Sequence, residues 1–421
     1  MAAAAEESAL QIQRHVKYWK RCHTSYLPAP YLSADSIRLT LACFIVSSLD
    51  ILNAPITAEE RQSIRKWVLS LQHPDGGFCG SSTHAHDGHQ ASKGTANLAA
   101  TYFALVLLAL AAGDDEQEQA RAFDQVKRKK LLLWLKKLQS EDGTFGQVLW
   151  DGAPAGGNDV RHGYIAAGIR WMLRGDVEQG SPAWVQDFDV DRLREAVRRA
   201  QTYDGGIGES SYQHESHGGY TYCGVSALAL LDRPNNLDEM HNDGLEAKVR
   251  DASGLLKFLS MRQFSYLSEQ EIEDDGESEN YIETEMQNMS LEEESPFVGF
   301  NGRWNKKADT CYAWWNGGSL SILDRLSVVK AEPSRRYLLD ITQHIIGGFS
   351  KNAGGPPDVQ HSYFGLAALS ILHDSSVKEL DVMLCCAMDT TRKIVKARDG
   401  LIASESASAG AWDDGFWDQK K

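Results

Sequence analysis

LQHPDGGF, at residues 71–78, contains a pattern that returns three more times along the chain. In each copy a helix-like stretch ends in Gln and a Gly follows four residues later, as in LQSEDGTF (138–145), AQTYDGGI (200–207) and TQHIIGGF (342–349). The glycines at 76, 143, 205 and 347 are 67, 62 and 142 residues apart, so the last gap spans about two periods. This spacing indicates a repeat architecture.

The long gap predicts a fifth copy that an insertion has split. MRQ at residues 261–263 and GFNGR at residues 299–303 read as its two halves. Between them, residues 269–294 hold twelve acidic and no basic side chains, so the net charge of −15 would be −15 + 12 = −3 without them. Low hydrophobicity combined with high net charge is typical of disorder. We therefore expect a disordered acidic insertion at residues 266–296.

A second kind of helix-like stretch follows each Gly turn and is apolar nearly all round, as expected of a helix buried on both sides. These stretches are RLTLACFIVSSLDIL (38–52), TYFALVLLAL (101–110), GYIAAGIRWML (163–173), YCGVSALALL (222–231), WWNGGSLSIL (314–323) and YFGLAALSIL (363–372). The stretches before the turns are amphipathic instead. Outer amphipathic and inner apolar helices, joined by Gly turns that supply positive φ, predict an all-α fold. We expect an α/α toroid (α-α6 barrel) of about six helical hairpins around a central cavity, a single domain over residues 1–421.

Bulk properties exclude several classes of protein. A net charge of −15 argues against nucleic-acid binding, which needs clustered Lys and Arg. The first residues lack a basic segment followed by an apolar one, so no secretory signal is expected, and we expect no membrane span. The seven cysteines are odd in number and widely spaced, unlike a disulfide framework. These features favour a reducing, cytoplasmic location.

The richest passage for chemistry is GRWNKKADTCYAWW, at residues 302–315. Asp309 and Cys311 can project together from the start of an inner helix, and His361 lies at the equivalent start of the last one. One oxygen, one sulfur and one nitrogen suit zinc with an open fourth position. The helix N-terminus and nearby cations predict a depressed pKa for Cys311. Taken alone, these residues could equally be a helix cap, a buried thiol and a hydrogen-bonded imidazole.

Other polar side chains are expected at the same rim, where inner helices begin. A cluster of cations and hydrogen-bond donors there could hold a diphosphate and stabilise its developing charge; the alternative is a solvated rim of helix ends. The cluster comprises Arg161, His217, Arg303, Lys306 and Tyr312. Aromatic residues at inner positions could be core or the wall of a pocket, and these are Tyr164, Tyr220, Trp314 and Trp315.

Taken together, these motifs resemble the β subunits of protein prenyltransferases, over most of the chain from about His15 to Asp374. The passages that carry the resemblance are RLTLACF, NDVRHGY, ESHGGYTYCG, GRWNKKADTCYAWW and HSYFG. The resemblance implies one zinc ion per chain, bound by Asp309, Cys311 and His361, with Asp358 orienting the ligands.

The same resemblance implies roles for the remaining site residues. The isoprenoid diphosphate would be held, and its departure assisted, by His217, Arg303, Lys306, Tyr312 and Lys351. The positions that line the pocket, or lie near the tail of the protein substrate, are Thr40, Phe44, Arg161, Tyr164, Tyr220, Cys223 and Trp315. A heterodimer with a helical α subunit is implied, with C-terminal CaaX peptides of small GTPases as acceptors.

Two positions favour the type I geranylgeranyl subtype. Farnesyltransferases carry Trp where this chain has Thr40, and the smaller residue leaves room for a C20 isoprenoid. Lys351 stands where farnesyltransferases have an aspartate that binds magnesium, so Mg²⁺ should not be required. Gln360 and Trp304 depart from the pattern of the family, and Gln360 could alter selectivity for the last substrate residue.

Alternatives within the family are a farnesyltransferase or a Rab geranylgeranyltransferase β subunit. Two other classes also share the toroid. A terpene cyclase would be expected to show a DxDD-type motif, which the sequence lacks. A non-catalytic protein-binding toroid would have no use for the Asp309, Cys311 and His361 set.

Overall fold

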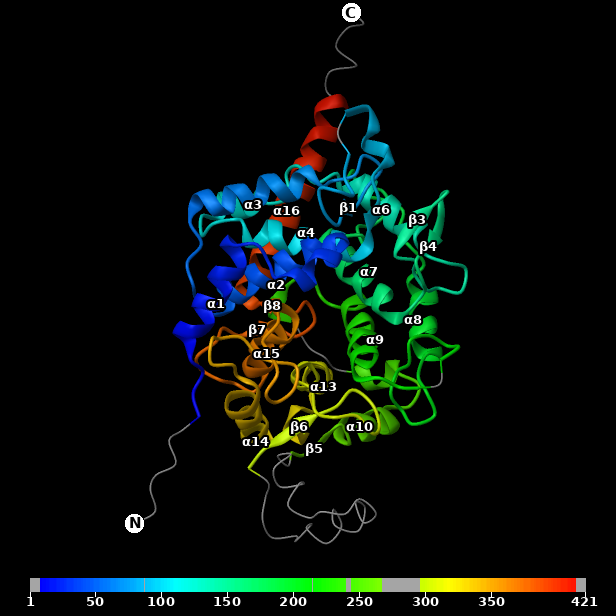
Figure 1. Cartoon of the computed structure of the whole chain (residues 1–421). Coiled ribbons are helices and arrows are strands. Elements are labelled where there is room, and N and C mark those ends of the chain that lie inside the picture. The colour runs from blue at the N-terminus through cyan, green and yellow to red at the C-terminus, as the bar shows by residue number, and fades with distance from the viewer. Residues whose placement is uncertain (1–7, 87, 214, 240–243, 267–295, 414–421) are drawn as a thin grey trace, which may run out of the picture.

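The computed structural model describes residues 8–86, 88–213, 215–239, 244–266 and 296–413. The predicted acidic insertion lies almost wholly outside these described residues, so its predicted disorder is not addressed. What is described forms two concentric rings of helices, seen end-on in Figure 1. The predicted α/α toroid is confirmed.

Six apolar helices form the inner ring. Each contacts the next, and α15 returns to α2, so the ring is closed. Because each is entered from an outer helix at the same rim, they run in the same direction. They are α2 (Arg38–Ile51), α4 (Leu98–Leu110), α7 (Val160–Met172), α9 (Gly218–Leu231), α13 (Thr310–Ile322) and α15 (Val359–Ile371). Most of their residues are buried, which explains why these segments are apolar all round.

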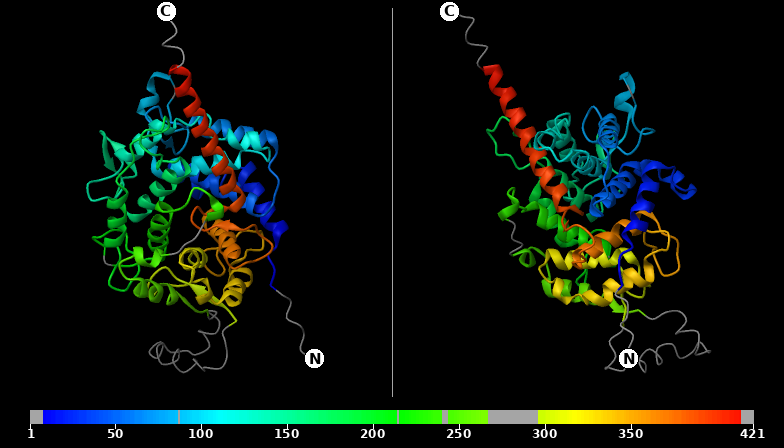
Figure 2. Two further views of the ribbon diagram at one scale, coloured as in Figure 1. Left: turned by 180° about the vertical axis from the view of Figure 1, so that it is seen from behind. Right: turned by 90° about the vertical axis from the view of Figure 1, so that its left-hand side faces the viewer.

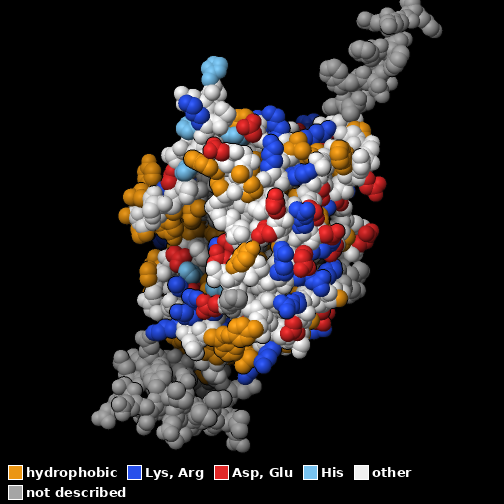
Figure 3. All heavy atoms as spheres, turned by 90° about the vertical axis from the view of Figure 1, so that its right-hand side faces the viewer, with side chains coloured by type: hydrophobic (Ala, Val, Ile, Leu, Met, Phe, Trp, Pro, Cys, Tyr) orange, Lys and Arg blue, Asp and Glu red, His pale blue; other side chains and the backbone are white. Residues whose placement is uncertain are grey.

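Amphipathic helices form the outer ring. They are α1 (Ile12–Thr24), α3 (Ala58–Ser70), α6 (Arg128–Lys137), α8 (Val190–Arg199), α10 (Ala252–Ser260) and α14 (Ala331–Arg336), which a π-helical turn, η6 (Tyr337–Thr342), extends. Figure 3 shows that acidic and basic side chains are interspersed over the face it presents. This pattern agrees with a nearly balanced charge outside the acidic insertion.

The Gln and Gly of the repeat join neighbouring hairpins. In the third copy, Gln201 donates from Nε2 to the carbonyl of Asp251 at 2.7 Å and accepts the Asp251 N–H at 2.8 Å, where α10 begins. Gly205 has φ 91°, and a Cβ there would overlap the backbone of Gly254. Equivalent hydrogen bonds connect the other turns to the start of the next outer helix. They are made by the side chains of Gln72, Gln139, Gln263 and Gln343.

The split fifth copy is present. In the four intact copies, Gln pairs with the residue six positions later, for example Gln72 with Phe78. In the fifth, Gln263 pairs with Phe300 across strands β5 (Gln263–Ser265) and β6 (Val298–Phe300). The same turn is therefore built from two distant pieces of chain, as the repeat predicted.

The remaining elements are short, apart from one long C-terminal helix. The strand pairs are β1 (Phe78–Cys79) with β2 (Ala96–Asn97), β3 (Val148–Trp150) with β4 (Ala153–Ala155), and β7 (Leu380–Asp381) with β8 (Cys386–Ala387). The short helices are η1 (Ala29–Ile37), η2 (Gly88–Lys93), α5 (Glu116–Ala120), η3 (Leu237–Glu239), η4 (Leu245–Lys248) and η5 (Leu326–Val328). Helix α16 (Met388–Asp413) contacts α4, α5 and α7, and Figure 2 shows it crossing one end of the barrel.

The cysteines and the apolar segments bear on two expectations from the sequence. All seven cysteines are free, as expected. One described segment, Ala29–Ile51, is long and apolar enough to cross a membrane by length and composition alone. The segment consists of η1 and α2, and α2 is apolar because it is an inner helix between two layers.

Candidate metal centre and lumen

Three potential metal ligands meet at the rim where α13 and α15 begin. Side-chain donor atoms of Asp309, Cys311 and His361 all lie within 4.8 Å of one another. Asp309 caps α13 by accepting the N–H of Cys311 at 2.9 Å, and its Oδ1 lies 3.4 Å from Nε2 of His361. Asp309 therefore does act as a helix cap, and this role is compatible with metal binding by the same carboxylate. An oxygen, a sulfur and a nitrogen in this arrangement fit zinc.

The charges in this cluster differ from expectation in one respect. Burial, and then the neighbouring Asp309 carboxylate, raise the pKa of the Cys311 thiol well above its usual value. The predicted depressed pKa was wrong for the metal-free site, because the cations of the preceding loop are exposed while Asp309 is adjacent. Burial opposes protonation of His361, but hydrogen bonds with Asp309 and Asp358 outweigh it and raise its pKa to about 9.

Lys351 lies at the edge of the same cluster. Its Nζ is 3.9 Å from Oδ2 of Asp309, and its side chain is mostly exposed. Its backbone carbonyl accepts the N–H of Thr310 at 3.0 Å, which ties the turn before α15 to the start of α13. A flexible ammonium group is thus placed beside the candidate metal ligands.

A histidine and a tyrosine on neighbouring inner helices form the second part of the rim. His217 accepts the N–H of Gly219 through Nδ1 at 3.0 Å, and its Nε2 lies 2.8 Å from the hydroxyl of Tyr312. Burial, followed by the charges of Arg303 and Arg161, lowers the pKa of His217 to about 4. The ring is therefore neutral at pH 7, carries its proton on Nε2 and donates it to Tyr312.

Two arginines flank this pair. Arg161 binds Asp159 through Nε at 3.0 Å and Nη2 at 2.6 Å, and its guanidinium lies 5.2 Å from the ring centroid of Tyr220. The Tyr220 ring is in turn 5.0 Å from the His217 ring. Arg303 pairs with Glu215 at 2.6 Å and remains 40% exposed. The predicted polar rim is thus largely assembled, and both arginine side chains are partly exposed.

The remaining predicted cation, Lys306, is exposed on the loop between β6 and α13. Trp304 anchors this loop, because its Nε1 donates to Asp204 at 3.0 Å and its ring covers the guanidinium of Arg262 at 3.9 Å. Trp304 is one residue beyond Arg303, so the anchor lies next to the predicted diphosphate-binding residues. Gln360 is exposed at the start of α15.

Below the rim, aromatic side chains from all six inner helices form a closed girdle around the lumen. Neighbouring ring centroids are 4.4–5.9 Å apart in the order Phe44, Phe103, Tyr102, Tyr164, Tyr222, Trp315, Phe364 and back to Phe44. Thr40 and Cys223 stand on α2 and α9 of the same ring, and Thr40 is partly exposed. Trp314 is fully buried and packs on Tyr222. Of the predicted wall residues, Phe44, Tyr164 and Trp315 belong to the girdle.

Comparison with known families identifies this architecture. The model of the prenyltransferase alpha-alpha toroid domain matches residues 10–386, most of the chain. This chain belongs to the prenyltransferase family. Geranylgeranyl transferase type-1 subunit beta of Arabidopsis thaliana is 31% identical over 382 residues, which cover 87% of this chain and 86% of that protein. Protein farnesyltransferase subunit beta of Pyricularia oryzae is 28% identical over 380 residues, covering 85% of this chain and 62% of that protein.

A solved structure agrees with the fold of this prenyltransferase over nearly its whole length. Candida albicans protein geranylgeranyltransferase-I, complexed with GGPP, aligns with a TM-score of 0.73 at 25% identity, covering 93% of this chain and 99% of that one. The chain is accordingly a prenyltransferase β subunit, and its enzyme class is that of prenyl-group transfer.

Several lumen residues of this prenyltransferase were missed from the sequence. Tyr102, Tyr222 and Tyr363 stand on the fifth residue of α4, α9 and α15, as the predicted Tyr164 does on α7. Five of the six inner helices carry an aromatic residue at this position, and α2 with Ala42 is the exception, so the pattern could have been recognised in the sequence. It was obscured because aromatic residues at helical spacing usually belong to an ordinary core.

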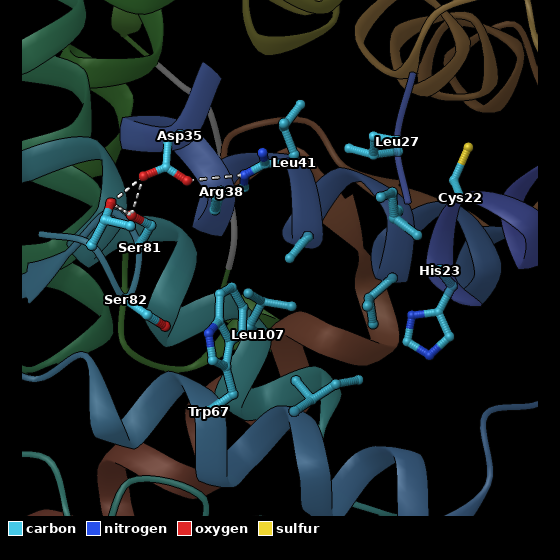
Figure 4. A pocket seen from close by; sticks show the side chains of 15 residues that line it. Cys22, His23, Leu27, Asp35, Arg38, Leu41, Trp67, Ser81, Ser82 and Leu107 are labelled. Atoms are coloured by element: carbon cyan, nitrogen blue, oxygen red, sulfur yellow. Dashed lines mark hydrogen bonds and ion pairs between the residues drawn. The ribbon is translucent and has the colours of Figure 1, made fainter. Parts of the chain in front are cut away.

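A cavity of this prenyltransferase lies outside the inner ring. It has a volume of about 410 Å³ and is bounded by α1, α2 and α3, with Trp67 and His23 on its walls (Figure 4). At its polar end Asp35 pairs with Arg38 and accepts a hydrogen bond from Ser81 at 3.2 Å. None of the predicted site residues lines it, so it is separate from the metal centre.

Proposed function

We propose that this chain is the catalytic β subunit of a protein geranylgeranyltransferase of type I. It transfers a C20 isoprenoid from geranylgeranyl diphosphate to the cysteine of a C-terminal CaaX sequence, typically CaaL. The observation that carries the proposal is the placement of Asp309, Cys311 and His361 at the mouth of an aromatic-lined lumen. Such a set has no purpose in a toroid that only binds proteins.

Asp309, Cys311 and His361 would hold one zinc ion per chain. When bound, zinc acts as a Lewis acid that lowers the pKa of the thiol of the substrate cysteine. The chain itself keeps the ligands in place. Asp358 holds Nδ1 of His361 at 2.6 Å, which leaves Nε2 directed at the cluster.

The rim and the girdle supply the rest of the reaction. The aromatic wall binds the isoprenoid and excludes water, while the rim holds its diphosphate. The thiol loses its proton to solvent, a sulfur–carbon bond forms at C1, and the carbon–oxygen bond to the diphosphate breaks with its electron pair leaving on oxygen. Tyr312, oriented by neutral His217, and the cations Arg303, Lys306 and Lys351 stabilise that charge.

Two residues support the subtype. Thr40 is small and partly exposed on α2, which leaves room for a fourth isoprene unit. Lys351 already places a positive charge 3.9 Å from Asp309, so Mg²⁺ should be dispensable. We propose a cytoplasmic heterodimer with an α subunit, acting on Rho-type small GTPases. The exposed apolar side chains Tyr26 and Leu32 are of the kind that a permanent partner covers.

The test is prenyl transfer by the chain co-purified with an α subunit, with C15 and C20 diphosphates in competition, with and without Mg²⁺. Preference for C20 without Mg²⁺ is expected. Preference for C15 with a Mg²⁺ requirement would instead identify a farnesyltransferase. Cys311→Ala should lose bound zinc and transfer together, whereas Cys79→Ala, at a buried cysteine outside the cluster, should keep both. Transfer by a zinc-free Cys311→Ala enzyme would refute the metal assignment.

A further inference from the structure

In the intact copies of the repeat, a polar side chain near the start of each inner helix binds the last residue of the Gly turn before it. In three copies the hydroxyl of the fourth helix residue accepts the N–H of the turn at 2.8–2.9 Å; the pairs are Thr101 with Phe78, Thr221 with Ile207 and Ser362 with Phe349. In the other intact copy, Nδ1 of His162 lies 3.0 Å from the carbonyl of Phe145. Helix α13 has Ala313 at its fourth position, a side chain that cannot make this bond for the split copy.

Asn316, the seventh residue of α13, connects the split copy to its helix instead. Its Nδ2 donates to the carbonyl of Asn301, the residue after Phe300, at 3.1 Å. The Asn316 side chain is 0% exposed, and a buried amide is costly unless it is hydrogen-bonded. The other inner helices carry apolar or small residues at the seventh position, namely Phe44, Ala104, Ala166, Gly224 and Gly365. Packing of the inner ring therefore does not require an amide here, whereas the bond to Asn301 explains it.

The residues that follow Phe300 form a loop with two of the predicted diphosphate-binding cations, Arg303 and Lys306. We call residues 301–306 the rim loop. Asn305 in this loop has a φ of 55°, in the left-handed region that costs energy for any residue other than glycine. A strained loop keeps one conformation only where the surrounding structure holds it there.

Hydrogen bonds to three carbonyls hold the rim loop in place. Asn316 binds the carbonyl of Asn301, and the amide of Asn301 donates in turn to the carbonyl of Lys306 at 2.9 Å. The carbonyl of Gly302 accepts the N–H of Gly218, the first residue of α9, at 2.7 Å. The two asparagine amides thus close the loop across its base and connect it to α13.

The rim loop and Asn316 also pack against the Tyr312–His217 pair. A Cβ at Gly302 would lie 2.2 Å from the ring of Tyr312, whose hydroxyl is 2.8 Å from Nε2 of His217. A Cβ at Gly218 would lie 2.5 Å from Oδ1 of Asn316. The contacts leave no room for a side chain at either glycine, so a shift of the loop would displace the tyrosine as well.

We infer that Asn316 and Asn301 are positioning residues for the diphosphate of the isoprenoid. They fix the backbone of the rim loop, so that Arg303, Lys306 and Tyr312 are already in place when charge develops on the leaving diphosphate. Donors that are fixed in advance stabilise such charge without the cost of reorganising during the reaction. This inference rests on the proposed function, since it assigns a support to the diphosphate site proposed there.

The experiment compares ligands with and without the diphosphate, on the chain co-purified with an α subunit. Inorganic diphosphate and geranylgeraniol, the alcohol without a diphosphate, each compete with a fluorescent isoprenoid diphosphate. Asn316→Leu keeps nearly the same volume but removes the donor. It should weaken binding of inorganic diphosphate, and lower kcat/KM for transfer, about fivefold or more, while geranylgeraniol binding changes less than about twofold. Bound zinc should stay at the wild-type amount.

Ser319→Ala is the matched control on the same helix. Ser319 is also fully buried, but its hydroxyl donates to the carbonyl of Trp315 within α13, at 2.7 Å. This variant should keep wild-type binding of both ligands. If Asn316→Leu does not fold, Asn301→Ala carries the test, because it removes the other amide from a loop rather than from a helix. It should weaken binding of inorganic diphosphate about threefold or more.

A double-mutant comparison shows whether Asn316 acts through the cations of the rim loop. In a background with Arg303→Ala and Lys306→Ala, Asn316→Leu should change inorganic diphosphate binding less than about twofold, because the groups that it positions are gone. An undiminished effect in this background would overturn the inference.

Two other results would overturn it as well. One is wild-type affinity for inorganic diphosphate in the folded Asn316→Leu and Asn301→Ala variants. The other is an equal loss of geranylgeraniol binding, which would mean that the asparagines only maintain the shape of the lumen. A wild-type complex that binds these ligands but transfers no prenyl group would overturn the proposed function alone.

Discussion

Nδ1 of His361 lies 2.6 Å from Oδ2 of Asp358, three residues earlier at the start of α15. The other carboxylate oxygen of Asp358 accepts the backbone N–H of His361 at 2.9 Å. One carboxylate thus caps the helix and also fixes the orientation of the ring, with Nε2 directed at Asp309. Ligand geometry and helix start are determined by the same residue.

The first prediction follows from this pair. Asp358→Ala frees the ring and should lower zinc affinity by about 10–100-fold, the usual effect of removing such a partner, measured by competition with a chelator. Asp251→Ala is the matched control, because Asp251 caps α10 by accepting the N–H of Gly254 at 2.9 Å, on an outer helix. It should cost about 1 kcal/mol of stability and leave zinc affinity unchanged. Equal zinc affinities in the two variants would contradict the role of Asp358.

The second prediction concerns pH and the closure of the outer ring. His15 on α1 is fully buried against the last Gly turn, with Nε2 3.0 Å from Gln343 and Nδ1 accepting the N–H of Gly348 at 3.2 Å. Burial lowers the pKa of His15 from 6.5 to about 4. Between these values the unfolded chain binds more protons, so stability falls as the pH falls through this window, by about 3 kcal/mol in total.

A variant that lacks only the histidine at position 15 isolates this effect. His15→Asn keeps an acceptor near Gly348 but cannot titrate, so its free energy of unfolding should fall less between pH 6.5 and 4. Carboxylates and His217 titrate in both proteins, so their contributions cancel when the two pH dependences are subtracted. Identical pH dependences, measured by urea unfolding, would show that His15 is not the responsible group.

The fold was predictable because its signals are local and repeated. Gln at the end of an outer helix and Gly four residues later are needed wherever one hairpin meets the next, as Gln201 and Gly205 show. Even the interrupted copy could be predicted from the sequence, since Gln263 and Phe300 occupy the expected repeat positions on the two sides of the insertion. The loop at residues 382–385, between β7 and β8, was not predictable. Tyrosine hydroxyls from four inner helices bind its carbonyls, but carbonyls have no sequence signature and these helices are far away in the chain.

The site was only partly predictable. Helix starts place Asp309, Cys311 and His361 at one rim, and the spacing of the repeat shows that these starts coincide. The protonation states do not follow from spacing. Cys311 was expected to be acidified by a helix N-terminus, but burial and the adjacent Asp309 have the larger effect. Such a balance depends on which charges are buried, and only the three-dimensional arrangement shows this.

The third prediction concerns Trp304. Its bond to Asp204 and its contact with the guanidinium of Arg262 hold the loop that carries Arg303 and Lys306. Trp304→Leu should raise KM for the isoprenoid diphosphate about fivefold, equivalent to about 1 kcal/mol, with kcat nearly unchanged. Trp150→Leu, at an exposed tryptophan on β3, should leave both constants unchanged. A fall in kcat with normal KM would mean that the loop acts in the transfer step instead.

The fourth prediction tests the glutamine hydrogen bonds that connect neighbouring hairpins. Gln201 is 7% exposed and binds the carbonyls of Gly205 and Asp251 and the N–H of Asp251. Gln201→Ala leaves these backbone groups without partners, so the free energy of unfolding should fall by about 2–3 kcal/mol. Gln213→Ala, at an exposed glutamine, should stay within about 0.5 kcal/mol of wild type. Because Gln201 joins the third turn to α10, hydrogen exchange should accelerate first at the start of α10. Uniform acceleration of hydrogen exchange across the barrel would mean that the Gln201 hydrogen bonds stabilise the whole ring rather than one junction.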